Sequence, residues 1–225
     1  MTRRIFITIE YDGAPFVGWQ RQVTGLSVQQ VLEEAASELT GDEVLVQGAG
    51  RTDSGVHATG QVAHLDVPDR FDANRVMEAL NALTAAHPVT IREAREVDGD
   101  THARFSATAR RYLYRILPRR QPPALDRGRV WHHRGKLDPA VMQRAADRLV
   151  GRHDFTSFRA SQCQANSPVR TLDELHVETA GEEIHVHASA LSFLHHQVRN
   201  IVGTLALVGG GKWTADDVSD ALAAK

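Results

Sequence analysis

Hydrophobic and polar positions alternate with two different periods along the first half of the chain. Strict alternation at Ile5, Ile7 and Ile9 predicts a strand. Apolar residues spaced three and four apart between Val28 and Leu39 predict a helix. The elements predicted in this way are, in chain order, a strand over 4–11, a helix over 28–40, strands over 43–49 and 61–67, a helix that Asp72 caps, and a strand over 89–97. This half therefore has the order β-α-β-β-α-β.

The second half shows a similar succession of patterns. Strands are predicted over 109–117, 170–178 and 182–190, helices over 139–150 and 195–208, and a further helix after Thr214. Repeated split β-α-β units predict an α+β fold with two ferredoxin-like halves, antiparallel mixed sheets, helices on the outer face and a central cleft. We expect the halves at residues 1–103 and 104–225, with a linker somewhere in 98–108. No strand follows the last helix to match 89–97, so the second half is expected to lack a final strand.

Residues that start and stop helices agree with these bounds. Ser27 is expected to cap the helix over 28–40 in a capping box with Gln30, and Gly41 is expected to end it. Asp138, followed by a proline, opens the helix over 139–150, which Gly151 should end.

Composition limits the class of protein. The chain has 225 residues and one cysteine, Cys163, so it has no internal disulfide, which fits a reducing cytoplasm. No apolar run reaches the roughly 18 residues that a membrane-spanning helix needs. The basic N-terminus leads into a strand pattern and not into a signal peptide. We therefore expect a cytoplasmic protein without a membrane span.

Charge is unevenly distributed, although the whole chain has a net charge of only −2. The segment from Arg104 to Arg134 contains nine arginines and one acidic residue, Asp126, and so carries +8. A local basic surface on a nearly neutral protein indicates contact with nucleic acid. The alternative is a solvated face in a chain that simply uses arginine in place of lysine.

The stretch GAGRTDSG, residues 48–55, holds an arginine and an aspartate between glycines. Val56 and His57 follow it where a phosphate-binding loop would have lysine and serine or threonine, and the spacing does not match a dinucleotide fingerprint either. What remains is a loop that presents Asp53. If the backbone is extended here, Arg51 points the same way as Asp53 and keeps it ionised. A purely structural Arg–Asp pair in a turn is the equal alternative.

Twelve histidines raise the question of a metal site. His185 and His187 share one face of a predicted strand, and His195 and His196 follow closely. No third acidic or thiol partner stands at a metal-ligand spacing in the sequence. Exposed or RNA-facing histidines are therefore the better interpretation, and no metal is expected.

Two further segments carry candidate RNA-binding residues. In ARRYLYRIL, residues 109–117, tyrosines at 112 and 114 occupy one face of a strand and Arg111 the other. Tyr112 either belongs to the core or stacks on a nucleobase while Arg110 and Arg111 hold phosphates. In HHQVRNIVG, Arg199 has apolar neighbours on a helix, so it needs a partner, for which Asp53 is a candidate.

Together these segments resemble the tRNA pseudouridine synthase A (TruA) family. Five motifs occur in the order of the family and span the chain from end to end. They are EYDGAPFVGWQRQ (10–22), GAGRTDSGVHATGQVAH (48–64), HARFSATARRYLYRIL (102–117), GRHDFTSFRA (151–160) and LHHQVRNIVGTL (194–205). The GRTDSGVHATGQV block is highly specific by itself.

The resemblance implies a pseudouridine synthase fold with a basic cleft, and the conversion of uridine to pseudouridine at positions 38, 39 and 40 of the tRNA anticodon stem-loop. It implies a homodimer that binds tRNA and uses neither cofactor nor metal. Asp53 would be the catalytic nucleophile and Tyr112 would stack on the target base, with Arg51 and Arg199 in the same pocket. Arg110, Arg111 and His57 are further candidates for RNA contacts.

The chemistry of the isomerisation is compatible with one carboxylate. Breaking the C1′–N1 bond builds positive charge on the ribose, which a carboxylate can stabilise or trap, and uracil leaves as a delocalised anion. Whether Asp53 attacks C1′, attacks C6 or removes a sugar proton stays open, as does the group that takes the C5 proton. The rival functions are a catalytically weakened tRNA-binding relative, owing to the short C-terminus, and a metal-dependent hydrolase.

Overall fold

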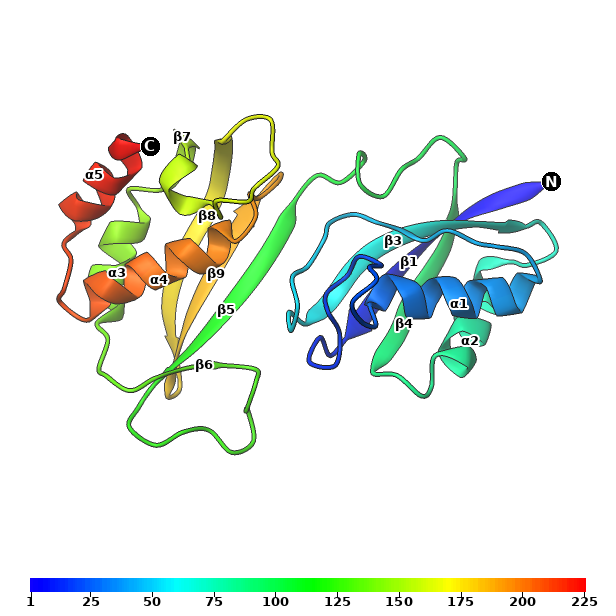
Figure 1. Cartoon of the computed structure of the whole chain (residues 1–225), viewed down its shortest axis with the longest axis horizontal. Coiled ribbons are helices and arrows are strands. Elements are labelled where there is room, and N and C mark those ends of the chain that lie inside the picture. Colours follow the sequence, from blue (N-terminus) through cyan, green and yellow to red (C-terminus); the bar gives the residue numbers. More distant parts are fainter. The chain divides into compact units, whose positions relative to one another are not determined.

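The computed structural model describes residues 1–225, and the chain divides into two compact units, Met1–Ala107 and Thr108–Lys225 (Figure 1). Each unit has its own sheet, its own helices and its own hydrophobic core. The protein is thus α+β, with two open sheets and five α-helices, in agreement with the fold class that the sequence predicts.

The first unit contains a four-stranded antiparallel sheet in the order β2-β3-β1-β4. The elements are β1 (Thr2–Tyr11), α1 (Val28–Thr40), β2 (Gln47–Gly48), β3 (Ala58–Pro68), α2 (Ala73–Leu83) and β4 (Val89–Val97). Ile5, Ile7 and Ile9 of the central strand are almost completely buried, and the inward stripes of both helices pack with them in one core. The period-two pattern of β1 therefore fixes which face of the sheet the helices cover.

Helix ends in this unit follow the predicted caps, with one difference. The Ser27 side chain accepts a hydrogen bond from the Gln30 backbone, and Gly41 ends α1 in the left-handed conformation. The Gln30 side chain, however, donates to Glu34 one turn along the helix, at 2.8 Å. The expected capping box is thus only half formed, because an i,i+4 partner competes for the glutamine amide.

The second unit contains a five-stranded sheet in the order β6-β5-β9-β8-β7, in which only the β5–β6 pair is parallel. Its elements are β5 (Arg110–Pro118), β6 (Trp131–His133), α3 (Pro139–Ala146), β7 (Gly151–Asp154), a 3₁₀ turn (Thr156–Phe158), β8 (Val169–Ala180), β9 (Glu183–Ala190), α4 (Gln197–Gly209) and α5 (Ala215–Ala224). Residues from α3, α4 and α5 pack on one face of this sheet. The other face is the one that β9 presents through His185 and His187, which alternate with buried Val186.

Two predicted elements are shorter than the sequence pattern suggests. In the predicted strand 43–49 only Gln47–Gly48 pairs with a neighbour. Val44 and Val46 are buried as the alternation implies, but their backbone N–H groups donate to the side chains of Ser37 and Glu33 on α1. At Val44 and Val46, side chains of α1 accept the backbone hydrogen bonds that a neighbouring strand would otherwise accept. The buried positions therefore alternate as in a strand, although no strand pairing forms there.

The predicted helix 139–150 ends at Ala146 in the structure. The next residues continue in tighter turns, in which Arg148 and Leu149 donate to carbonyls only three residues back. Leu149 is nevertheless fully buried, which explains why the hydrophobic period continues beyond the helix.

Strands β6 and β7 are short and were not predicted. None of the helices is both long enough and apolar enough to span a membrane.

His64 joins the sheet of the first unit to the segment that follows β4. It lies on the sheet face opposite the helices, is 3% exposed, and stacks on Phe6 with ring centroids 5.9 Å apart. Its Nδ1 accepts a hydrogen bond from the Ala103 backbone at 3.2 Å. Burial, with smaller effects from Arg4 and His102, lowers the pKa of His64 to about 4. The ring is thus held neutral in the folded chain.

We predict that His64 weakens the fold on acidification. The unfolded chain takes up a proton at this ring below about pH 6.5, whereas the folded chain does so only near the lowered pKa, so stability is lost as pH falls through this window. His64→Asn keeps an acceptor near Nδ1 and removes the titration. From pH 7 to pH 5, the wild-type free energy of unfolding in urea should fall by roughly 1–2 kcal/mol more than that of the variant. Equal losses in the two proteins would contradict the assignment.

Candidate active site

The predicted site residues fall into two groups, one in each unit. Arg51, Asp53 and His57 lie on the loop between β2 and β3 of the first unit. Arg110, Arg111 and Tyr112 begin β5 of the second unit, and Arg199 lies in the first turn of α4.

Asp53 opens a tight turn in the loop of the first unit. The Val56 backbone N–H donates to the Asp53 carbonyl at 3.2 Å, and Gly55 has φ +76°. A positive φ at the third position is what a type II turn requires, which explains the glycine there. Asp53 is partly buried, while Ser54 and Gly55 at the tip are exposed. The turn therefore fixes the backbone direction at Asp53.

Residue Thr52, next to Asp53, is held by two buried aromatic residues of the segment 10–22. The Trp19 backbone donates to the Thr52 carbonyl at 3.0 Å, and the Tyr11 hydroxyl is 2.7 Å from the Thr52 hydroxyl. Tyr11 and Trp19 are each 3% exposed and belong to the core of the unit. The backbone before Asp53 is thus tied to the rigid sheet and not only to its own turn.

Further contacts hold the rest of the turn against the same segment. The Ser54 hydroxyl donates to the Phe16 carbonyl at 3.2 Å, and the Gly13 backbone donates to His57 Nδ1 at 3.1 Å. His57 Nδ1 also lies 3.0 Å from an Asp12 carboxylate oxygen. These contacts give His57 a structural role in closing the loop, and its expected RNA contact stays a prediction.

Two glycines of the segment 10–22 permit this close approach. A side chain at Gly18, which has φ +115°, would place Cβ 2.6 Å from the Thr52 carbonyl oxygen. A Cβ at Gly13 would lie 2.1 Å from the Val56 carbonyl oxygen. Backbone meets backbone at both places, so neither contact could be relieved by turning a side chain. Sequence reasoning assigned such a role only to the glycines of the 48–55 loop.

The expected alignment of Arg51 with Asp53 does not rest on a strand in this structure. Arg51 is exposed, whereas Asp53 is partly buried. The alternation that was expected to align the two side chains requires an extended strand, whereas residues 51–53 belong to no strand. The position of Asp53 depends instead on the anchoring of Thr52 and Ser54.

Tyr112 of the second unit stands on the helix side of its sheet. It pairs with Ala188 of β9, while Arg111 and Leu113 point to the opposite face. Its ring is half buried and meets Phe193 edge to face, with centroids 5.2 Å apart and planes at 84°. This contact leaves Tyr112 with a fixed ring plane and an accessible part, which suits stacking on a base.

Arg199 differs from its expected environment. It is exposed, whereas the buried side of α4 is formed by other residues, among them Gln197, Ile201 and Val202. The helix begins after His196, whose φ of 60° is rare for a residue with a side chain, and no side chain caps its first N–H groups. A helix N-terminus with an arginine in its first turn favours an anion such as phosphate.

Part of the basic segment 104–134 is already neutralised within the second unit. Arg115 binds Glu183 through two hydrogen bonds of 2.7 and 2.8 Å and also contacts Asp126 at 3.2 Å. The Arg115 hydrogen bonds lower the pKa of Glu183 despite its burial. Arg119 pairs with Glu182 through a single contact of 2.6 Å. The charge of +8 therefore overstates the positive surface, because acidic partners from β9 and the turn before it were not visible in the local sequence.

Arg110 and Arg111 lie side by side in the sequence at the start of β5, on opposite faces of the strand. The Arg110 guanidinium donates to the Leu191 carbonyl, which is a neutral acceptor, and Arg111 is exposed. A carbonyl orients a guanidinium without cancelling its charge. The exposed guanidinium of Arg111 is therefore suited to contact with an anionic ligand.

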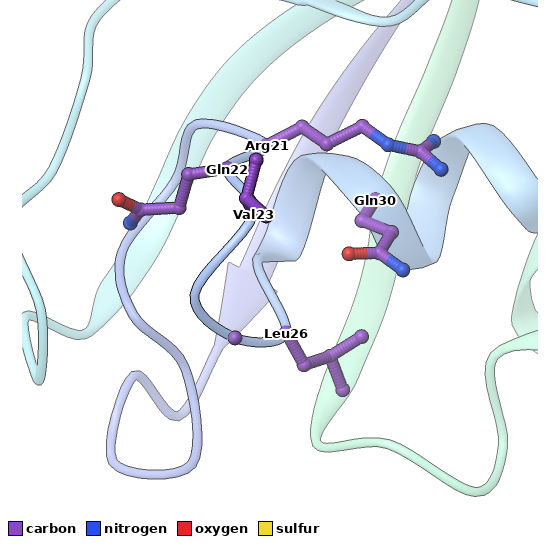
Figure 2. A pocket seen from close by; sticks show the side chains of 6 residues that line it. Arg21, Gln22, Val23, Leu26 and Gln30 are labelled. Carbon is purple, nitrogen blue, oxygen red and sulfur yellow. The ribbon is translucent and has the colours of Figure 1, made fainter.

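One surface hollow of the first unit does not have the features of a small-molecule site. It has a volume of about 550 Å³ and lies between the 21–26 loop and Gln30 of α1. Figure 2 shows the side chains of Arg21 and Gln22 diverging from each other, so its polar groups do not converge on one point. Neither Arg51 nor Asp53 lines it.

Comparison with known proteins identifies the family. The model of a family described as tRNA pseudouridine synthase matches residues 7–106 and 145–225. The chain belongs to the tRNA pseudouridine synthase family. The match includes the loop of Asp53, its anchoring segment and helix α4 with Arg199. It thereby confirms the family that the five sequence motifs indicate.

Curated relatives agree over nearly the whole chain. A protein of Rhodospirillum rubrum is 59% identical over 98% of this chain and 80% of its own length, and bears the name tRNA pseudouridine synthase A. Proteins with the same name from Rhodospirillum centenum and Paramagnetospirillum magneticum are 59% and 55% identical over 97% and 99% of the chain. The synthase resemblance therefore extends through both units.

We predict that Gly18→Ala displaces the Asp53 loop. The new Cβ would overlap the Thr52 carbonyl, so the backbone beside Asp53 must move. Isomerase activity on tRNA should therefore fall by at least about ten-fold. Gly41→Ala is the matched control, because Gly41 also has positive φ but open space around its Cβ position.

Gly41→Ala should lose about 1 kcal/mol of folding stability through backbone strain, and Gly18→Ala should lose more because of the added overlap, both measured by urea unfolding. Only Gly18→Ala should lose activity in a tritium-release assay on tRNA. Full activity in Gly18→Ala would show that the close approach does not position the loop.

Proposed function

We propose that this chain isomerises uridine to pseudouridine in tRNA, at positions 38, 39 and 40 of the anticodon stem-loop, with Asp53 as the catalytic nucleophile. The observation that carries the proposal is the anchoring of Thr52 by Tyr11 and Trp19, which holds the neighbouring carboxylate at the start of a turn. This loop lies within the region that the synthase family model matches. The names of the relatives support tRNA as the substrate.

The reaction requires few groups from the protein. The C1′–N1 glycosidic bond breaks, the uracil turns over, and a C1′–C5 bond forms. One proton leaves C5 and one is gained at N1, so the atoms balance without a cofactor. A carboxylate close to the ribose stabilises the positive charge that develops on bond cleavage, or traps it covalently.

A rigid loop suits this chemistry better than a mobile one. Stabilisation by a preorganised charge is strong because the charge does not have to be reoriented during the reaction. Hydrogen bonds from two buried residues and the Ser54–Phe16 contact provide this preorganisation at Asp53.

The second unit provides groups suited to holding RNA. Flipping a base out of its stack costs a few kcal/mol, and stacking on the ring of Tyr112 would offset roughly 1–3 kcal/mol of this. Phe193 fixes the plane of that ring. The start of α4 with Arg199, together with Arg110 and Arg111, supplies positive groups for phosphates.

Other parts of the expectation remain predictions. They are a homodimer that binds one tRNA, the location in the cytoplasm, and a reaction without metal or cofactor. The family match and the names of relatives at 51–59% identity favour catalysis over a tRNA-binding protein without activity.

We predict that Asp53→Asn retains tRNA binding and loses activity by at least about a thousand-fold, because an amide neither attacks carbon nor balances the ribose charge. Tritium release from C5-labelled uridine in tRNA measures the rate, and filter binding measures the affinity. Asp42→Asn, an exposed acid in the same unit, should behave as wild type. Normal turnover of Asp53→Asn would remove this residue from the mechanism.

We also predict that tRNA affinity falls steeply with salt and that Arg110→Ala and Arg111→Ala each reduce the slope. Removal of one arginine–phosphate interaction should lower the slope of log K against log salt by about one. Arg75→Ala, an exposed arginine on α2 of the first unit, is the control and should keep the wild-type slope. An unchanged slope in both β5 variants would mean that this strand does not contact the RNA backbone.

A further inference from the structure

The second unit has a cluster of histidine and glutamate side chains on the sheet face away from its helices. His185 and His187 lie two residues apart on β9 and so point to the same side, alternating with buried Ile184 and Val186. Glu178 of β8 stands directly opposite His185 in the antiparallel register. The cluster is thus built by two neighbouring strands of one sheet.

The ligand atoms of the three residues are close enough to share one ion. One oxygen of Glu178 and one ring nitrogen each from His185 and His187 all lie within 4.8 Å of one another. The shortest of these contacts joins His187 Nε2 to Glu178 at 3.0 Å. Ligand atoms around a tetrahedral zinc ion stand roughly 3–3.5 Å apart, given metal–ligand bonds of about 2 Å, so small rotations of side chains suffice.

We propose that Glu178, His185 and His187 form a binding site for a divalent transition metal of the zinc class. Two imidazoles and one carboxylate are a ligand set that zinc accepts, and they leave a fourth position open. With neutral imidazoles the set carries one negative charge, which favours a cation. Sequence spacing alone did not reveal the site, because the third ligand comes from another strand.

Neighbouring groups are compatible with a bound cation. Glu183 accepts a hydrogen bond from His185 at 2.9 Å and also pairs with Arg115 through both its oxygens. Coordination at Nε2 would exchange the His185–Glu183 and His187–Glu178 hydrogen bonds for metal bonds, while Glu183 stays paired with Arg115. The positive charge of Arg115 is balanced by Glu183 and Asp126, so it opposes the cation only weakly.

A fourth ligand is available on β8. His176 lies opposite His187 in the register, with ring centroids 6.2 Å apart. Its Nε2 is 3.9 Å from the second oxygen of Glu178. A rotation of this exposed ring would close the site, whereas water would fill the position otherwise.

The site is accessible and separate from the proposed catalysis. The side chains of Glu178 and His187 are 47% and 37% exposed, so a metal can enter without opening the core. Tyr112 lies on the opposite face of the same sheet. A metal here would tie β8 to β9 and stabilise the folded state, since it binds the native arrangement only. It would take no part in the isomerisation.

Cobalt is a suitable probe, because it occupies zinc sites and absorbs visible light when bound by protein ligands. The untagged full chain should bind one Co²⁺ with a visible absorption band, and Zn²⁺ should abolish that band by displacement. His187→Gln and Glu178→Gln should each weaken Zn²⁺ binding by about ten-fold or more in competition with a chromophoric chelator. His87→Gln, which removes a histidine from the first unit, should bind as wild type.

The unfolding midpoint of each variant without metal shows whether it is folded, and a folded His187→Gln with wild-type affinity would overturn the proposal. Absence of saturable binding at one ion per chain would overturn it as well, as would equal weakening in His87→Gln. Tritium release from tRNA should be unchanged in His187→Gln and in the presence of chelator. Loss of that activity would contradict the separation of this site from catalysis, independently of whether Asp53 is the nucleophile.

Discussion

The position of the proposed catalytic loop depends on one backbone contact. The Trp19 N–H reaches the Thr52 carbonyl because Gly18 has no side chain in the way, and Tyr11 completes the hold through the Thr52 hydroxyl. Tyr11 and Trp19 are in turn fixed by the core under β1. The backbone at Asp53 is thus held as rigidly as the packed sheet, although Asp53 lies on a loop. Catalysis by a fixed charge requires such rigid placement.

The second unit divides its chemistry between the two faces of one sheet. Alternation along β5 and β9 sends Tyr112 to the helix side, and sends Arg111, His185 and His187 to the other. The proposed base stacking and the proposed metal binding are therefore on opposite faces of the sheet. The same alternation brings Glu183 to Arg115, so that part of the positive charge in the basic segment is balanced by internal pairs.

Local patterns predicted most of the fold, since helix periodicity, strand alternation and end caps act between near neighbours. Helix α1 begins after Ser27 and ends at Gly41 as predicted, and α5 begins at its Thr214 cap. The pattern failed where a distant side chain replaced a local partner. Val44 and Val46 alternate like a strand, yet Ser37 and Glu33 take their hydrogen bonds, so no long strand forms there.

The sequence by itself determined the family, the α+β class, the place of Asp53 in a glycine-rich loop and the alternation that puts Tyr112 and Arg111 on opposite faces of a strand, because motif identity and residue periodicity are properties of the linear chain. Only the tertiary structure decided how that aspartate is held, that Arg51 and Arg199 are exposed, and that Glu178 lies beside two histidines. Each of these depends on which strands and loops become neighbours. Packing brings residues that are far apart along the chain into contact, and local sequence patterns do not show which of these contacts form.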